Sequence, residues 1–309
     1  MNAIELFAGM GLSSIGLVWS KCRLVRAYEI MPNLVSAFNG QEIGLLPPVA
    51  RQADLSKRSS LVKEQEPIHL LAGGPVCKAF SPGATVFGTQ GRDDERNTFP
   101  YFFDAIDFFN PTHVLMENSF GLARFQGYLN EIKDALTMRG YLHNSFEIDC
   151  FDFGVPQHRR RLVIMASKAG QPLCPKPFRV ATDPSCVGEC LQPAPMYDPW
   201  PITAPISPKG MAYLHRDPRH LKKHPPMNME KPASTVVANY HRGVPYGLVD
   251  LYGTLELCGP RLAGRLQGLP ERYRLDRLSK TEALKAIGNG FPPHVVAAAV
   301  RSFQELKSD

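Results

Sequence analysis

Residues 70–81 read LLAGGPVCKAFS, an apolar run that stops at two glycines and a proline and is followed at once by a cysteine. A short apolar run bounded by turn residues predicts a buried strand and then a loop. Cys77 therefore stands where a loop can present its thiol to a ligand, which makes it a candidate nucleophile if its surroundings favour the thiolate. The stretch alone is equally compatible with a cysteine that packs under a loop as a small hydrophobic residue.

The N-terminus shows the same strand-then-turn pattern and adds a helix. Residues 1–8 predict a strand and Gly9 and Gly11 a turn, as in nucleotide-binding α/β units, where glycines let backbone amides approach a ligand. A second strand over 24–28 ends at Glu29, which is placed to accept hydrogen bonds from ribose hydroxyls. The glycine pattern is too short for a dinucleotide, and no lysine follows for a triphosphate. A nucleoside ligand such as S-adenosylmethionine is favoured, although without Glu29 a plain tight turn would be the better interpretation.

Strands and helices alternate along the first half of the chain, which predicts an α/β fold with a Rossmann-like, doubly wound sheet. The expected helices cover 12–19, 31–39, 99–109 and 125–139, and the further strands 53–55, 69–72, 113–116 and 141–149. The carboxyl ends of parallel strands share one edge of a sheet, so Glu117 is expected on the same rim as Cys77. The polar loop over 85–97 suits a cover over a site.

A basic cluster, Gln-His-Arg-Arg-Arg, enters an apolar strand. The period of two in a strand places Gln157, Arg159 and Arg161 on one face. His158 and Arg160 then share the other face. Three consecutive arginines are compatible with a solvated surface or with a phosphate-binding patch. Because the run leads straight into a core strand, we expect one face to point into the site.

The chain changes character at about residue 170. Residues 170–235 contain 14 of the 28 prolines and three cysteines. This composition predicts a separate, loop-rich region with short strands, followed by a strand over 235–240. Residues 216–224 are basic and fit contact with a polyanion, although an exposed surface segment explains them equally well. Helices are expected again over 261–267, 281–286 and 294–306.

Composition limits the class of protein. The 309 residues suffice for one large core and a second, smaller domain, and the hydrophobic share of 44% is ordinary for a soluble globular protein. Seven scattered cysteines favour a reducing cytoplasm, and Cys174, Cys186 and Cys190 lack the spacing of a zinc site, so we expect no metal. No segment reads as a signal peptide or a membrane span. The net charge of +6 permits a polyanionic partner without requiring one.

Six short motifs, in order along nearly the whole chain, resemble those of the bacterial-type cytosine-5 DNA methyltransferases, which depend on S-adenosylmethionine. The motifs are ELFAGMG (5–11), GGPVCKAFS (73–81), EN (117–118), QHRRR (157–161), RLAGRLQGLP (261–270) and GNGFPP (288–293). The resemblance implies the class I S-adenosylmethionine methyltransferase fold. It also implies a catalytic and cofactor-binding domain over 1–169, a target-recognition domain over 170–255 and a C-terminal segment, 256–309, that returns to the catalytic domain.

The resemblance further implies an activity and the residues for it. A methyl group would pass from S-adenosylmethionine, leaving S-adenosylhomocysteine, to C5 of a cytosine flipped out of a specific double-stranded DNA sequence. The implied nucleophile is Cys77, which adds to C6 of the base. Glu117 would serve N3, Arg161 would serve O2, and Arg159 would hold the surrounding site. The implied cofactor-binding residues are Phe7, Gly9, Gly11, Glu29, Asp54, Leu55, Pro75, Phe99 and Asn289.

The chain departs from the family's pattern at four positions. Val76 and Lys78 flank the thiol where proline and glutamine are usual. Ser119 stands in place of valine, and Leu262 in place of glutamate. Because proline fixes φ, its loss is expected to loosen the loop. Lys78 adds a charge beside the thiol, which can lower the thiol's pKa or bind a backbone phosphate.

Two alternative activities remain open from the sequence. One branch of the family acts on tRNA, although the Cys-Phe-Thr tripeptide of that branch is absent here. The other alternative is a non-catalytic, DNA-binding homologue, which the altered neighbours of Cys77 suggest. The resemblance also implies a monomer that is cytoplasmic and associated with the nucleoid, with no membrane partner. Such a protein acts either beside a cognate restriction endonuclease or as an orphan enzyme.

Overall fold

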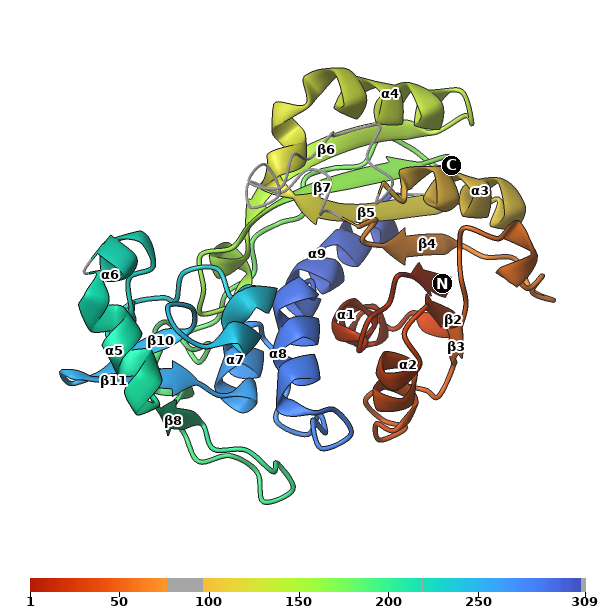
Figure 1. The fold of residues 1–309 in the computed structure, drawn as a ribbon. Coiled ribbons are helices and arrows are strands. Elements are labelled where there is room, and N and C mark those ends of the chain that lie inside the picture. Colours follow the sequence, from red (N-terminus) through yellow and green to blue (C-terminus); the bar gives the residue numbers. More distant parts are fainter. Residues whose placement is uncertain (77–96, 218, 307–309) are drawn as a thin grey trace.

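The computed structural model describes residues 1–76, 97–217 and 219–306, and its larger part is built on one seven-stranded sheet (Figure 1). The strands lie in the order β3-β2-β1-β4-β5-β7-β6. Five of them are parallel: β1 (Asn2–Leu6), β2 (Arg23–Glu29), β3 (Ala50–Gln52), β4 (Leu70–Gly73) and β5 (His113–Ser119). In contrast, β7 (Arg160–Ser167) runs antiparallel to both β5 and β6 (Leu142–Asp149).

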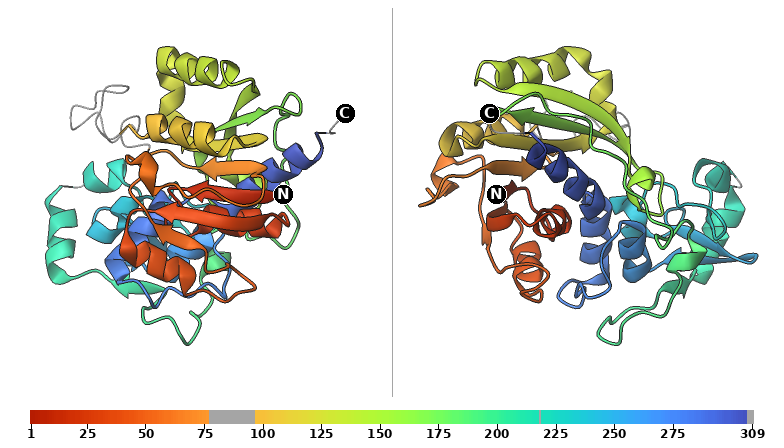
Figure 2. Two further views of the ribbon diagram at one scale, coloured as in Figure 1. Left: turned by 90° about the vertical axis from the view of Figure 1, so that its right-hand side faces the viewer. Right: turned by 180° about the vertical axis from the view of Figure 1, so that it is seen from behind.

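Helices cover both faces of this sheet. On one face lie α1 (Leu12–Trp19), α2 (Pro32–Asn39) and α9 (Pro293–Gln304), and on the other lie α3 (Phe99–Phe109) and α4 (Gln126–Thr137). Seen from behind, α9 lies across the sheet (Figure 2). The alternation in β1 explains the two layers, because Ala3 belongs to the core on the α1 and α9 face and Ile4 to the core on the α3 face. Burying a side chain of the size of Ile4 contributes about 1.5–3 kcal/mol to stability.

A smaller lobe carries a four-stranded sheet in the order β8-β11-β10-β9. Its elements are β8 (Thr203–Pro205), α5 (Pro208–Arg216), α6 (Arg219–Lys223), β9 (Met227–Asn228), β10 (Leu248–Leu251) and β11 (Thr254–Cys258). Between the two lobes lie α7 (Pro260–Leu266) and α8 (Lys280–Asn289) (Figure 1). Short 3-10 turns occur at η1 (Arg58–Ser60), η5 (Phe120–Arg124), η6 (Cys150–Phe153), η7 (Gly188–Cys190) and η8 (Ala238–Arg242). No described helix has the length and apolarity that a membrane crossing requires.

Most of the expected elements are present within a few residues of their predicted bounds, and the third strand, expected to close over 53–55, lies just before that segment. The strand β3 ends at Gln52, and the chain then turns. Asp54 Oδ1 holds this turn by accepting from the Ser56 N–H at 3.1 Å and from Ser56 Oγ at 2.7 Å. The side chain thus competes locally with sheet pairing, as aspartates commonly do in turns.

The strand expected over 235–240 is wrong, because side chains occupy the place of a neighbouring strand. Gln157 Oε1 accepts from the Val236 N–H at 2.7 Å, and Arg159 donates to the Val236 carbonyl at 2.8 Å. The backbone then enters the 3-10 turn η8. The sequence did not predict α5, which begins with Pro208 and is capped by Ser207, whose Oγ accepts from the Gly210 N–H at 3.2 Å.

Candidate active site

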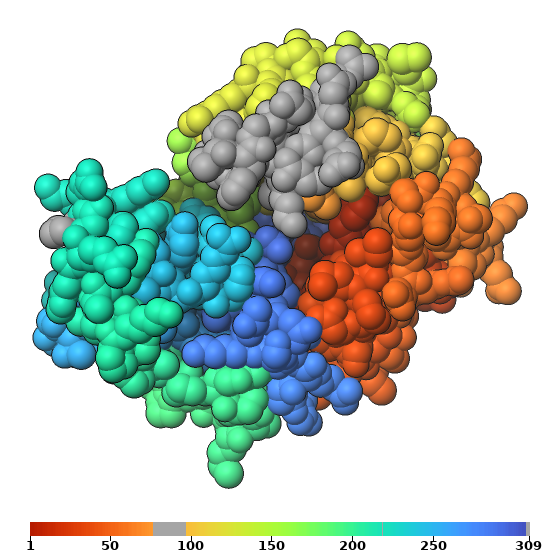
Figure 3. All heavy atoms as spheres, in the orientation of Figure 1, coloured from red at the N-terminus to blue at the C-terminus, as the bar shows by residue number. Residues whose placement is uncertain are grey.

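A cavity of about 460 Å³ opens at the carboxyl ends of the parallel strands. The molecular surface is hollowed between the N-terminal residues, red and orange, and the blue C-terminal segment (Figure 3). The volume lies in the usual range for a small-molecule site, roughly 300–1,000 Å³. Seven of the expected cofactor residues line this cavity: Phe7, Gly9, Glu29, Asp54, Leu55, Pro75 and Asn289.

The glycine turn after β1 is held by Glu29. The Gly9 N–H donates to Glu29 Oε2 at 2.8 Å, and the Met31 N–H donates to Glu29 Oε1 at 2.9 Å. Gly9 has φ 56°, and a Cβ there would meet nothing within 4 Å, so the outer side of the turn is open to a ligand. Each carboxylate oxygen has a second lone pair. Glu29 can therefore shape the turn and still accept hydrogen bonds from a ribose.

Two expected cofactor residues do not line the cavity. Gly11 is the N-cap of α1, and a Cβ there would lie 2.7–2.9 Å from Leu46 and Phe38, so packing requires the glycine. Phe99 is fully buried, with its ring edge-on to that of Tyr128 at 5.8 Å between centroids. Gly11 and Phe99 therefore belong to the packed structure around the cavity and not to its lining.

Several lining residues were not predicted from the sequence. They are Ala8, Met10, Leu12, Ser13, Tyr28, Ile30, Met31, Leu34, Ala53, Ser56, Gly74, Val76, Thr98, Tyr101, Ala286, Gly290 and Phe291; the predicted catalytic residue Glu117 also lines the cavity. One signal for them was available, because Ile30 and Met31 follow Glu29 directly and are 58% and 48% exposed. A pair of exposed apolar residues directly after a strand-end carboxylate offers an apolar surface to a ligand. The others reach the cavity through tertiary packing.

An ion pair joins Glu117, which lines the cavity at the end of β5, to Arg161, which is not among the lining residues. Arg161 Nε is 2.7 Å from Glu117 Oε1, and the two side chains are 14% and 13% exposed. The antiparallel pairing of β5 with β7 brings these side chains together, since Ser119 is paired with Arg161. The Glu117 carboxylate can contact a ligand in the cavity, and the Arg161 guanidinium holds that carboxylate in place. Cys77 and Lys78, like residues 85–96 of the expected loop, lie outside the described residues.

The backbone leading to Cys77 is held from β5. Asn118 is 1% exposed and donates through Nδ2 to the Pro75 carbonyl at 2.9 Å. Glu117 Oε2 would lie 3.0 Å from a Cβ at position 74, so Gly74 leaves room for the carboxylate. The residues around Pro75 are therefore fixed next to the Glu117 carboxylate.

Arg159 makes a different set of contacts from Arg161. It is 1% exposed and donates to the carbonyls of Val236 at 2.8 Å, Gly288 at 3.1 Å and Gly290 at 2.8 Å. Gln157 is also fully buried and donates to the last residue of α7 at 2.6 Å. The expected alternation of faces is confirmed, because His158 and Arg160 are exposed. The inward side chains join segments that lie far apart in the sequence.

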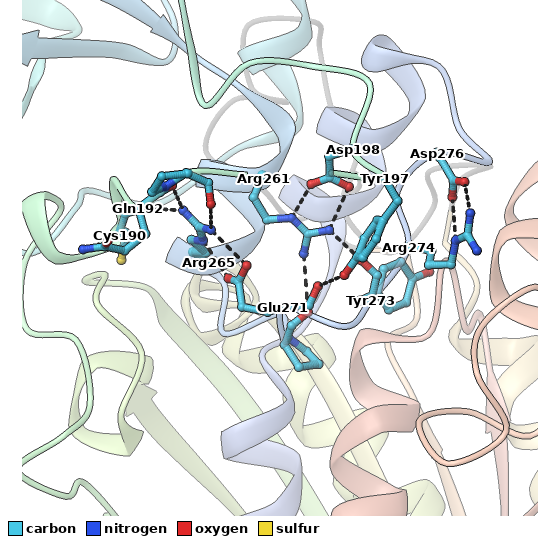
Figure 4. A network of polar contacts seen from close by, with 12 residues as sticks. Cys190, Gln192, Tyr197, Asp198, Arg261, Arg265, Glu271, Tyr273, Arg274 and Asp276 are labelled. Carbon is cyan, nitrogen blue, oxygen red and sulfur yellow. Dashed lines mark hydrogen bonds and ion pairs between the residues drawn. The ribbon is translucent and has the colours of Figure 1, made fainter. Parts of the chain in front are cut away.

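A second arginine–carboxylate pair is not part of the cavity lining and connects the segment before β8 to α7 (Figure 4). Arg261 Nε donates to Asp198 Oδ2 at 2.5 Å, and its second nitrogen donates to Oδ1 at 2.9 Å. Arg261 also donates to the Tyr273 carbonyl at 2.6 Å, and both charged side chains are 1% exposed. Leu262, where the family's pattern has glutamate, is fully buried in the core, so an apolar side chain suits its surroundings.

A buried carboxyl lies in β1, just before the glycine turn. Glu5 is 1% exposed, and burial raises the pKa of its side chain to about 7 despite a hydrogen bond from the Ser14 hydroxyl. No arginine or lysine is among the groups that shift its pKa. Glu5 is therefore a carboxyl that stays protonated in the folded protein at mildly acidic pH.

Several of the described cysteines are buried and are poor nucleophiles. Burial raises the pKa of both Cys150 and Cys190 to about 12, so these thiols stay protonated at neutral pH. Cys174 is exposed, and its pKa is also raised by partial burial. Within the described ranges, no three histidine, cysteine or acidic side chains are grouped so that they could hold a metal ion.

Comparisons with known proteins agree with one another. Residues 1–187 match the family model described as C-5 cytosine-specific DNA methylase. The chain is 29% identical to the Type II methyltransferase M.NaeI of Lentzea aerocolonigenes, over 96% of this chain and 73% of that relative. It is 27% identical to the Type II methyltransferase M.NgoMIV of Neisseria gonorrhoeae, over 97% and 96%. The crystal structure of the S. pombe Dnmt2 methyltransferase has the same fold, with a TM-score of 0.72 over 99% of both chains at 15% identity.

Proposed function

The chain belongs to the C-5 cytosine-specific DNA methylases, a family that uses S-adenosylmethionine, and on that premise we propose the reaction and the residues that perform it. A methyl group is transferred to C5 of a cytosine flipped out of a specific double-stranded DNA sequence, and S-adenosylhomocysteine is released. The observation that carries the proposal is the Glu117 carboxylate, which lines the same cavity as Gly9 and Glu29 and is paired with Arg161 at 2.7 Å.

The cavity residues fit S-adenosylmethionine, which supplies an electrophilic methyl group when bound. Glu29 accepts hydrogen bonds from the ribose, while Phe7 and Gly9 bring the backbone close to the ligand. Asp54 and Leu55 contact the adenine edge. Pro75 and Asn289 complete the wall, and Gly11 and Phe99 hold it from behind. The chemistry requires no metal ion.

The target base is activated by covalent addition. The Cys77 thiolate forms a bond to C6, and the displaced electron pair moves onto the ring, where Glu117 protonates N3 and Arg161 stabilises O2. C5 then takes the methyl group. A water molecule takes the C5 proton, the electrons of that C–H bond restore the C5–C6 double bond and expel the Cys77 thiolate, and N3 returns its proton to Glu117. Arg159 donates to three backbone carbonyls and so holds the backbone that leads to Arg161 in place. Flipping the base costs roughly a few kcal/mol in lost stacking.

The smaller lobe is the region that reads the DNA sequence. We assign residues 170–255 to target recognition, with 1–169 and the returning segment 256–309 forming the catalytic domain. The second sheet and the basic stretch 216–224 on α5 and α6 support this assignment. The enzyme acts as a monomer in the cytoplasm on nucleoid DNA, as an orphan or beside a cognate restriction endonuclease.

The test is methyl transfer from labelled S-adenosylmethionine to mixed-sequence duplex DNA, followed by analysis of the nucleosides. We expect label in 5-methylcytosine, its loss in Cys77→Ser, and a covalent adduct with DNA that contains 5-fluorocytosine. The exposed Cys174 provides a matched control, since Cys174→Ser should transfer normally. Transfer to tRNA alone, or DNA binding without adduct or transfer, would contradict the proposal.

A further inference from the structure

One hydrogen bond joins the two described ends of the segment that contains Cys77. The Val76 N–H donates to Thr98 Oγ1 at 2.7 Å, across 22 residues of sequence. Both residues are half-buried and line the cavity. The family's pattern has proline at position 76, and proline has no N–H. Val76 therefore has a backbone N–H donor that a proline would lack. A partly buried donor without a partner is unfavourable.

Thr98 is unusual for a residue at the start of a helix. It occupies the N-cap position of α3, where a threonine hydroxyl normally accepts from the first helical amides. In the described chain its side chain makes no capping bond, and Asn97 Oδ1 accepts from the Phe99 N–H at 3.2 Å instead. The Thr98 hydroxyl is thus used for Val76 and not for the helix.

The support behind Thr98 is rigid. Phe99 and Phe102, in the first turn of α3, are fully buried in the core. On the other side, Asn118 holds the Pro75 carbonyl. Two consecutive residues before Cys77 are therefore fixed by side chains from two different elements, Pro75 from β5 and Val76 from α3.

We propose that Thr98 is a positioning residue for the nucleophile: its hydroxyl fixes the Val76 backbone by a hydrogen bond, where the family's pattern uses a proline ring. The proposal rests on the proposed function, because it takes Cys77 as the nucleophile. Thr98 acts through Val76 and takes no part in bond making.

The first test removes the hydroxyl without changing the shape of the side chain. Thr98→Val should lower kcat by about three- to tenfold, the loss expected for one hydrogen bond. The KM values for S-adenosylmethionine and DNA should change less than kcat. The melting temperature should fall only by the small amount that the loss of one partly buried hydrogen bond causes, because the hydroxyl does not cap α3. Thr98→Ser keeps the hydroxyl and should recover most of the rate. The matched control is Thr137→Val on α4, where the hydroxyl bonds only to exposed groups.

The second test removes the donor. In a Val76→Pro background the N–H is absent, so adding Thr98→Val should cause no further loss of kcat. If Thr98→Val lowers kcat equally in both backgrounds, or if Thr98→Ser fails to recover the rate, the hydroxyl does not act through Val76 and the inference is wrong.

A third measurement separates this inference from the proposed function. The rate of Cys77 alkylation by iodoacetamide, followed by peptide mass spectrometry, needs no methyl transfer. Thr98→Val should change that rate at least twofold at fixed pH, and Thr137→Val should not. A wild-type protein that transfers no methyl group to DNA contradicts the proposed function while this readout still tests Thr98. Normal transfer with unchanged alkylation and kcat in Thr98→Val contradicts the inference alone.

Discussion

The two arginine–carboxylate pairs of this molecule have the same chemistry and opposite surroundings. Arg161 and Glu117 lie 2.7 Å apart with side chains 14% and 13% exposed, and Glu117 lines the cavity. Arg261 and Asp198 are 1% exposed and form a bidentate ion pair, and Arg261 also donates to a backbone carbonyl. In the first pair the Glu117 carboxylate lines the cavity and can meet a ligand there. The second pair is buried and has its partners within the protein. Burial and partners, more than residue type, separate a reactive pair from a structural one.

The largest expected effect comes from breaking the Glu117–Arg161 pair. Glu117→Gln removes the proposed acid at N3, and we expect methyl transfer to fall by about 10²–10⁴-fold. The melting temperature should change little compared with a break of the buried pair, because the Glu117 and Arg161 side chains are 13% and 14% exposed and those of Arg261 and Asp198 are 1% exposed. Single-turnover transfer and thermal melting measure the two quantities. Normal transfer by Glu117→Gln would remove Glu117 from the proposed mechanism.

Breaking the buried pair should have the reverse outcome. Asp198→Asn leaves the Arg261 guanidinium without its counter-charge in the interior, which we expect to cost about 3–5 kcal/mol in the free energy of unfolding. Urea denaturation measures this. The matched control is Asp217→Asn, since Asp217 pairs with an Arg219 side chain that is 87% exposed and such a pair contributes little. Equal effects of the two substitutions would show that burial does not govern the Asp198 pair.

Glu5 is a further buried carboxyl. Glu117 and Asp198 are each paired with an arginine, whereas no arginine is among the groups that shift the pKa of Glu5. Its pKa is about 7 in the folded protein and near 4.5 when exposed. Between these values the unfolded chain loses the proton and the folded protein keeps it, so stability should fall as pH rises from about 4.5 to 7. The loss is roughly 3 kcal/mol. Urea denaturation across this pH range should show the slope, and Glu5→Gln should abolish it. An identical slope in the variant would assign it to other groups.

The smallest expected effect is on cofactor binding. Glu29→Gln keeps the shape of the side chain but removes the charge that accepts from the Gly9 and Met31 amides. We expect S-adenosylmethionine to bind about tenfold more weakly, which corresponds to about 1.4 kcal/mol. Calorimetric titration measures this, with the exposed Glu42→Gln as the matched control. Unchanged affinity would exclude Glu29 from the ribose contact.

The sequence predicted the features that depend on local order. The glycine turn with Glu29 twenty residues later, and the period of two that separates Arg159 and Arg161 from Arg160, both follow from strand geometry. The pairing of Arg261 with Asp198 joins residues 63 positions apart, and no local pattern predicts it. The strand expected over 235–240 was wrong for a similar reason, since Gln157 and Arg159 hold that backbone from a distant element.

The most direct test of the contrast between the two pairs measures both quantities on both variants. Methyl transfer and the free energy of unfolding are determined side by side for Glu117→Gln and Asp198→Asn, with transfer measured at a temperature where both variants are folded. We predict that Glu117→Gln loses transfer and keeps its stability, and that Asp198→Asn loses stability and keeps most of its transfer per folded molecule. A Glu117→Gln protein that transfers normally but unfolds easily would contradict the account.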